Sequence, residues 1–179
     1  MKDDLFSASS LHFKSHFRTA EYYIGSTDNY DFDHIYELID LYTDGFCLYG
    51  NYKLAEYLMM HGVTVYQYIL SYVGSSSLSI IEGTGVIGAN HGDDILYVWN
   101  YMNLPMDGDD VAVSDIMTKA WTDFATYGDP TPPGSKFSWT PLETTSHFSF
   151  WNISGPNPEM EHSDYVQERM ALWESLLEN

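Results

Sequence analysis

The sequence predicts an α/β fold, and three observations indicate it. The run from Val63 to Val73 is rich in β-branched and aromatic residues and nearly free of charge, which is typical of a strand buried on both faces of a sheet. Residues 44–60 before this run and residues 114–127 after it carry apolar side chains at helical spacing. A buried strand flanked by helices is the arrangement of α/β proteins.

The N-terminal part predicts helices. Residues 1–43 are rich in Tyr, Asp and His with weak helical periodicity, and we expect short helices or turns there. Asp44 is expected to cap a clearer helix that ends at His61-Gly62. Its apolar positions are Phe46, Leu54, Leu58 and Met59. The strand that follows is broken by Gly74-Ser75-Ser76-Ser77.

A glycine-rich loop then leads to the segment from Ala89 to Asp94, and the residues from Ile95 to Tyr101 predict a short apolar helix. Residues 103–112 are expected to be a loop. Ser114 is expected to cap the next helix, which ends at Tyr127-Gly128-Asp129-Pro130. The apolar stripe of that helix is Ile116, Met117, Ala120, Trp121, Phe124 and Ala125.

The C-terminal part predicts an edge strand from His147 to Ile153 and an amphipathic helix from Tyr165 to Leu177. Because Trp121, Phe124 and Trp173 fall on apolar stripes, we expect them to belong to the core.

Composition excludes several classes of function. The chain has 179 residues with 15 Tyr, 9 Phe and 5 Trp, enough apolar material for a folded core. A net charge of −19 argues against nucleic acid and against anionic membrane surfaces as partners. No apolar run is long enough to span a bilayer. The single cysteine, Cys47, forms no internal disulfide and is expected to be a small buried apolar residue.

Three segments in the second half resemble the type-B carboxylesterase family. The run from Gly88 to Trp99 resembles the family's histidine block, a Gly-x-x-His followed by a small residue, two polar or acidic residues and an aromatic-apolar run. Trp121 to Pro130 resembles its Trp-x-x-Phe-Ala-x-x-Gly-x-Pro helix end, and Phe137 to Leu142 its Trp-Pro stretch. More loosely, Thr43 to Phe46 and Val65 to Tyr72 resemble upstream family segments in the same order.

The resemblance covers residues 17–178 and implies the C-terminal part of a single α/β-hydrolase domain, residues 1–179, with a mostly parallel sheet flanked by helices. We expect this fold to be incomplete in the chain. The family cleaves carboxylic esters with a serine, an acid and a histidine, in that chain order. The sequence contains no Gly-x-Ser-x-Gly elbow, and Gly74-Ser75-Ser76-Ser77-Leu78 lacks the closing glycine. The nucleophile, its acid and the oxyanion-hole glycines are therefore expected in an N-terminal half that this chain needs and lacks.

His91 is identified by the resemblance as the general base of that triad. Imidazole suits the role because its ordinary pKa, near 6.5, lets it accept and return a proton at neutral pH. The other histidines are expected to be surface or core residues, because none has a metal-ligand spacing. They are His12, His16, His34, His61, His147 and His162. We predict neither a metal nor a cofactor.

Asp94 comes three residues after His91, and the resemblance implies a supporting role in an acidic network beside the triad; a helix-start carboxylate is the alternative. We expect Asp93 to be charge in the first helical turn only. The run Asp107-Gly108-Asp109-Asp110 is expected to be a solvated loop, because the later Gly and Glu of a calcium loop are missing. The sequon Asn152-Ile153-Ser154 would accept a glycan in a secreted protein, and secretion is expected for the complete parent.

Two classes of function remain open from the sequence. The first is a serine carboxylesterase acting on a small ester, to which this chain supplies the histidine. The second is an esterase-like adhesion or binding protein without catalysis. An intact histidine block favours the enzyme, because an adhesion protein has no chemical need for the imidazole.

Overall fold

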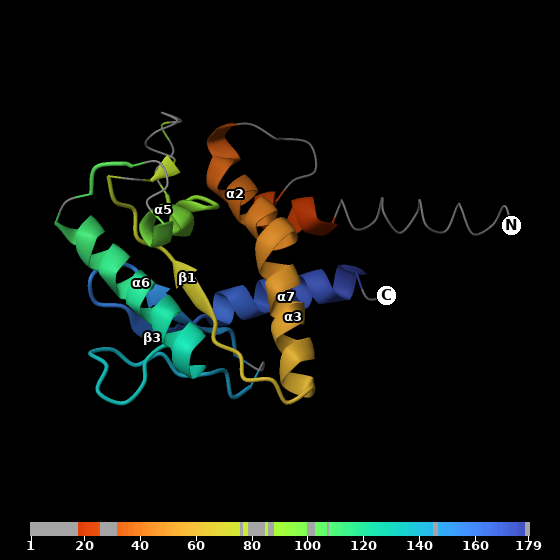
Figure 1. The fold of residues 1–179 in the computed structure, drawn as a ribbon. Coiled ribbons are helices and arrows are strands. Elements are labelled where there is room, and N and C mark those ends of the chain that lie inside the picture. The colour runs from red at the N-terminus through yellow and green to blue at the C-terminus, as the bar shows by residue number, and fades with distance from the viewer. Residues whose placement is uncertain are drawn as a thin grey trace, which may run out of the picture. The chain divides into compact units, whose positions relative to one another are not determined.

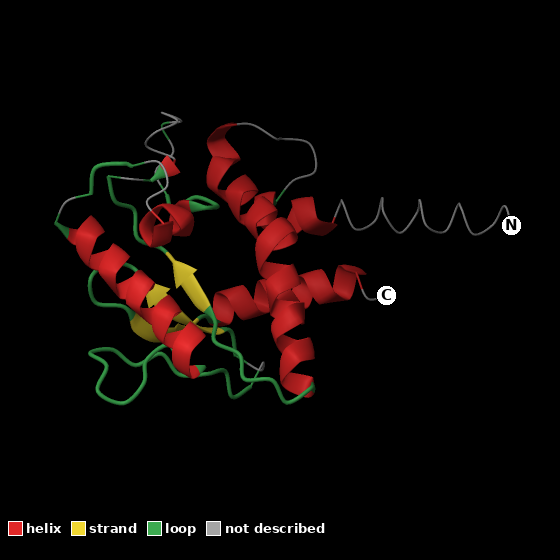
Figure 2. Cartoon of the chain, in the orientation of Figure 1, coloured by secondary structure: helices red, strands yellow, loops and turns green. Residues whose placement is uncertain are grey.

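Figures 1 and 2 show the helices and strands of the chain. These elements divide into two compact units. The computed structural model describes residues 18–25, 32–75, 77–78, 85, 88–99, 103–106, 108–144 and 147–177. The first unit comprises Met1–Val63 and Asp164–Asn179, and the second comprises Thr64–Ser163.

The first unit is helical. Its elements are a helix over residues 18–24, η1 (Phe32–His34), α2 (Ile35–Thr43), the π-helical segment η2 (Asp44–Leu48), α3 (Tyr49–Met60) and α7 (Asp164–Leu177). The predicted end at His61-Gly62 is confirmed: Gly62 has φ +72°, and its N–H donates to the Met59 carbonyl at 2.9 Å. The predicted C-terminal helix is also confirmed as α7.

The prediction that Asp44 begins a helix is wrong. Asp44 lies inside the unbroken run of α2, η2 and α3, with helical φ −67° and ψ −49°. Its carboxylate is fully buried and is held by Arg169, with Nε 2.8 Å from Oδ2 and Nη2 2.9 Å from Oδ1, and by the Tyr23 hydroxyl. A buried carboxylate needs such partners, whereas a capping carboxylate faces solvent at a helix end.

The second unit contains a mixed three-stranded sheet. Its strands are β1 (Tyr68–Leu70), β2 (Ser149–Ile153) and β3 (Glu159–His162), in the order β1-β2-β3. β1 runs parallel to β2, with Tyr68 opposite Trp151, and β2 runs antiparallel to β3. The strand predicted at 147–153 is confirmed over Ser149–Ile153, but its predicted edge position is wrong, because β2 lies between the other two described strands.

The predicted strand from Val63 to Val73 is regular only over the three residues of β1. Around it the chain stays extended but pairs irregularly: the Val65 carbonyl accepts from Leu142, and the N–H groups of Ser71 and Tyr72 both donate to the Ile153 carbonyl. Val63 is 47% exposed and β1 is half-buried, so burial on both faces was also wrong for the described structure. β-branched composition indicates extended backbone but does not specify the neighbours on each side.

The helices α5 (Asp93–Trp99) and α6 (Asp109–Tyr127) accompany the sheet. The short helix predicted at 95–101 is confirmed over Ile95 to Trp99, and residues 100–102 lie outside the described part. The N-cap prediction for Ser114 is wrong: Ser114 lies inside α6 and its hydroxyl donates to the Tyr97 carbonyl at 2.6 Å. The predicted loop 103–112 likewise overlaps the first turn of α6.

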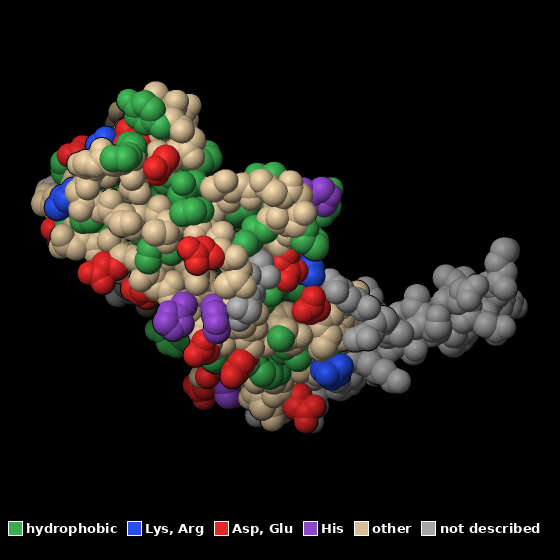
Figure 3. All heavy atoms as spheres, turned by 90° about the horizontal axis from the view of Figure 1, so that it is seen from below, with side chains coloured by type: hydrophobic (Ala, Val, Ile, Leu, Met, Phe, Trp, Pro, Cys, Tyr) green, Lys and Arg blue, Asp and Glu red, His purple; other side chains and the backbone are tan. Residues whose placement is uncertain are grey.

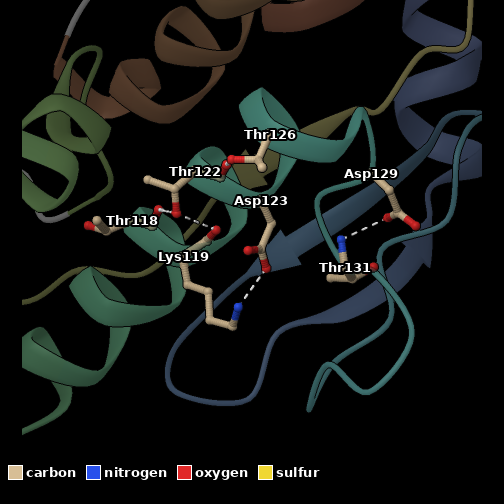
Figure 4. Close-up of polar contacts among 7 residues, drawn as sticks. All are labelled: Thr118, Lys119, Thr122, Asp123, Thr126, Asp129 and Thr131. Atoms are coloured by element: carbon tan, nitrogen blue, oxygen red, sulfur yellow. Dashed lines mark hydrogen bonds and ion pairs between the residues drawn. The ribbon is translucent and has the colours of Figure 1, made fainter.

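The end of α6 follows the prediction. Gly128 has φ +71°, and its N–H donates to the Phe124 carbonyl at 2.8 Å. Figure 4 shows the polar side of this helix, where Lys119 pairs with Asp123 at 2.7 Å and the Thr122 hydroxyl donates to the Thr118 carbonyl. Beyond the helix, Asp129 accepts from the Thr131 N–H and stabilises the turn.

The core of the second unit lies between α5, α6 and the sheet. Its buried members are Tyr97, Val113, Met117, Ala120, Trp139, Trp151 and Ile153. Trp121 packs against this core as predicted, with its ring 4.8 Å from Tyr68. The core prediction for Phe124 is wrong, because it is 48% exposed. Trp173 is half-buried in α7 of the first unit.

The surface is strongly acidic, in keeping with the net charge of −19, and acidic side chains are prominent on the face drawn in Figure 3. Among the residues that the structure describes, no helix has both the length and the apolar character needed to cross a membrane.

Candidate functional site

His91 lies in a tight turn directly before α5. His91 is exposed, and its backbone N–H donates at 2.9 Å to Oδ1 of Asn90. Gly92 completes the turn with φ +90°, a conformation that disfavours residues with a Cβ. Two backbone bonds close the turn onto the helix, from Asp93 to the Asn90 carbonyl at 3.1 Å and from Ile95 to the Gly92 carbonyl at 3.1 Å. The imidazole is thereby presented to solvent from a hydrogen-bonded turn.

Asp93 ties this turn to the preceding loop. Its side chain is fully buried, and Oδ2 accepts from the Asn90 N–H at 2.9 Å and from the Ser77 hydroxyl at 2.8 Å. Oδ1 accepts from the Leu78 N–H at 2.8 Å. The prediction that Asp93 is only first-turn charge is therefore wrong. The buried Asp93 carboxylate therefore has a structural role, because a buried carboxylate without hydrogen-bond donors would destabilise the fold.

Asp94 is bound to a different element. Its Oδ2 accepts from the Tyr68 hydroxyl of β1 at 2.7 Å, and its Oδ1 lies 3.0 Å from the Ile95 N–H. Burial raises the pKa of Tyr68, and the hydrogen bond to Asp94 and the charge of Asp94 raise this pKa further. The two neighbouring aspartates thus fix the start of α5 to two separate places, Asp93 to residues 77–78 and Asp94 to the sheet.

A further buried carboxylate, that of Asp110, lies in the first turn of α6. It accepts from the hydroxyls of Tyr72 at 2.9 Å, Tyr97 at 3.4 Å and Ser75. A Cβ on Gly74 would overlap Oδ1 of Asp110, so this position needs glycine. The prediction of a solvated loop is wrong for Asp109 and Asp110, which begin α6, and Asp107 lies outside the described residues. The signal available in the sequence was the hydroxyl-rich run from Tyr72 to Ser77.

The segment that comes nearest to a nucleophile-elbow motif, Gly74-Ser75-Ser76-Ser77-Leu78, binds the carboxylates of Asp110 and Asp93. Ser75 donates to Asp110 and Ser77 donates to Asp93, while Ser76 lies outside the described residues. The Ser75 hydroxyl thus binds the start of α6, and the Ser77 hydroxyl binds the start of α5.

Asn152, the predicted glycan acceptor, lies in β2 opposite Ile69 of β1 and Glu159 of β3. Its Nδ2 donates to Glu161 at 2.9 Å, and its Oδ1 accepts from the Ser71 hydroxyl at 2.5 Å. The glycan stays a prediction.

The remaining histidines do not gather into a site where they are described. His61 follows α3 and contacts the Tyr57 carbonyl at 2.7 Å, His147 and His162 are exposed, and His34 is half-buried. His12 and His16 lie outside the described residues. No group of three or more His, Cys, Asp or Glu side chains that could hold a metal ion occurs within the described ranges.

Comparison with known proteins places the chain in a family. The profile of the Carboxylesterase family matches residues 5–173. Juvenile hormone esterase of Tribolium castaneum is 27% identical over 188 residues, which cover 89% of this chain and 32% of that protein. The chain therefore spans about a third of the length of this relative.

Solved structures show the same fold. Juvenile hormone esterase from Manduca sexta, with OTFP covalently attached, matches with a TM-score of 0.70 at 22% identity over 89% of this chain and 31% of that chain. The carboxylesterase EST55 of Geobacillus stearothermophilus matches with a TM-score of 0.59 at 21% identity over 87% of this chain and 31% of that chain. The predicted α/β-hydrolase fold, present here in part, is confirmed. By the family profile and its span, the chain belongs to the carboxylesterase family.

Proposed function

We propose that this chain is the C-terminal portion of a single serine-carboxylesterase domain and that His91 is its general base. The observation that carries the proposal is the exposed imidazole of His91 on a turn closed by hydrogen bonds, within the family's histidine block. The serine and its acidic partner would lie in a preceding part of the same protein. The chain's span of about a third of its relative supports this division.

In the proposed reaction, His91 takes the proton of the serine hydroxyl as that oxygen attacks the ester carbonyl. The protonated imidazole then gives the proton to the departing alcohol, which leaves an acyl-enzyme. In the second half, His91 removes a proton from water as the water attacks the acyl group and returns it to the serine. Each step needs a base that can reach the reacting atoms, and the solvent exposure of His91 supports this role.

We propose a small carboxylic ester as the substrate. We also propose that the parent protein is secreted, and the Asn152 sequon is the feature that supports secretion. A non-catalytic adhesion protein is the competing function. It would need neither the imidazole nor a buried carboxylate behind the turn that carries it.

The test is His91→Ala in the complete protein, assayed on p-nitrophenyl acetate. Loss of one triad member costs about 10⁴- to 10⁶-fold in kcat in serine hydrolases. His147→Ala is the matched control, because His147 is also an exposed histidine of the second unit. We expect the control to keep wild-type turnover and both variants to keep the wild-type dichroism spectrum. A His91→Ala enzyme that retains more than about a tenth of wild-type kcat would exclude the proposed role.

A further inference from the structure

The carboxylate of Asp93 holds the backbone that carries His91, and we infer that Asp93 is a positioning residue for the proposed general base. The inference rests on the proposed function of His91. Asp93 Oδ2 accepts from the N–H of Asn90, the residue directly before His91, at 2.9 Å. The Asp93 N–H in turn donates to the Asn90 carbonyl at 3.1 Å. Both backbone groups of the residue next to His91 are therefore fixed by Asp93.

The other end of this clamp is the loop that follows β1. Ser77 donates to Oδ2 and Leu78 to Oδ1, each at 2.8 Å. Ser77 and Asp93 are both fully buried. The carboxylate thus joins two chain segments that are separated by about a dozen residues, and rotation of the His91 turn would break bonds at both oxygens.

Only a carboxylate satisfies these donors. The three donors all need acceptors, and a carboxylate offers two acceptor oxygens with several lone pairs. An asparagine offers one oxygen, and its amide NH₂ would face at least one N–H or O–H donor. Asp93→Asn should therefore release one of the two segments while nearly preserving side-chain volume.

Interaction of the Asp93 charge with the dipole of α5 does not explain why its carboxylate is buried. Asp109 has the same place in α6 that Asp93 has in α5, the first residue of the helix, yet Asp109 is exposed to solvent. If the helix dipole were the whole role of Asp93, solvent exposure would serve it as well. Asp109→Asn is therefore the matched control.

A displaced base affects the rate of the chemical step more than binding. Misplacement of a catalytic group by about 1 Å costs on the order of 10²-fold in rate. We expect Asp93→Asn to lower kcat by about 10- to 100-fold with KM nearly unchanged, because the lost interaction acts only through the transition state. Asp109→Asn should leave both constants unchanged.

The experiment uses the complete esterase and p-nitrophenyl acetate, with active sites counted by a covalent serine inhibitor. Asp93→Asn is measured in the wild-type background and again in the His91→Ala background. If Asp93 acts through His91, the second measurement shows no further loss, whereas general damage to the fold lowers both rates. Equal loss in both backgrounds overturns the inference.

One further variant, Ser77→Ala, keeps the outcomes distinct. If Asp93→Asn does not fold, Ser77→Ala removes one donor and keeps the carboxylate; a fall in kcat of about 3- to 10-fold at constant KM supports the inference, and an unchanged kcat overturns it. If His91→Ala alone retains activity, the proposed function fails. If His91→Ala is inactive but Asp93→Asn behaves as Asp109→Asn does, only the positioning role fails.

Discussion

At the scale of single residues, the bond between Tyr68 and Asp94 has a measurable consequence. Tyr68 donates to Asp94 at 2.7 Å, and burial together with this carboxylate raises the pKa of the phenol. Asp94→Asn removes the negative charge but leaves the burial. The pKa of Tyr68 should therefore fall towards its ordinary value while remaining above it.

This first prediction is checked by titrating the tyrosinate absorbance of the complete protein above pH 9. Compared with the wild type, Asp94→Asn should show one additional tyrosine ionising at lower pH. The control is the same substitution in a Tyr68→Phe background, where the difference should vanish. A difference that persists in that background would assign the effect to another tyrosine and contradict the proposed pairing.

Residue types near His91 were partly predictable from the sequence. The histidine block singled out His91 and Asp94, and the structure places His91 in the turn directly before α5 and Asp94 in the first turn of α5. The histidine block did not show that Asp93 differs from a solvated first-turn charge, because the burial of Asp93 depends on Ser77 and Leu78 folding back onto it. Such contacts between distant segments leave no periodic signal in the chain.

At the scale of elements, the π-helical segment η2 packs against α7. Gly45 in η2 lies so close to Trp173 that a Cβ would sit 2.8 Å from Cη2 of the indole. The indole is also held in place by its Nε1–H, which donates to the Tyr23 hydroxyl at 3.0 Å. Gly50, one turn later in α3, has open space where its Cβ would be.

The second prediction follows from this contrast between two helical glycines. Gly50→Ala should stabilise the protein by about 0.5–1 kcal/mol, because alanine is the better helix former. Gly45→Ala should destabilise it by about 1–3 kcal/mol, because the indole must shift and its hydrogen bond to Tyr23 weakens. Urea unfolding of the two variants beside the wild type measures both effects. Stabilisation of Gly45→Ala to the same degree as Gly50→Ala would exclude the close packing of Trp173.

Element ends were better predicted than element starts. Gly62 and Gly128 end α3 and α6 where expected, since both take positive φ and this signal is local. Asp44 and Ser114 were wrong as helix starts, because each binds a tertiary partner: Arg169 for Asp44 and the Tyr97 carbonyl for Ser114. A polar residue before an apolar stripe does not reveal whether the helix has already begun.

At the scale of the whole molecule, the described chain exposes a strand edge and several large apolar side chains. In the described sheet β1 has β2 as its only partner, so one of its edges is unpaired. Large apolar side chains are strongly exposed in both units: Phe46 is 80% exposed, Met60 77%, Trp99 75% and Tyr36 64%. Unpaired strand edges and exposed aromatic groups favour association between chains.

The last prediction is that the 179-residue chain by itself is poorly soluble and has no serine-dependent esterase activity. Attack on an ester needs an activated serine in an elbow, and the sequence contains no Gly-x-Ser-x-Gly. His91 without an oxyanion hole or an orienting acid would provide only weak imidazole catalysis. The charge of −19 opposes aggregation by repulsion, so the residual soluble fraction should be expanded, with far-UV but little near-UV dichroism. The test is expression of residues 1–179 alone, with a p-nitrophenyl ester assay beside both dichroism spectra. Inhibitor-sensitive turnover by a cooperatively folded monomer would overturn the proposed division of the triad, because such activity requires a nucleophile within this chain.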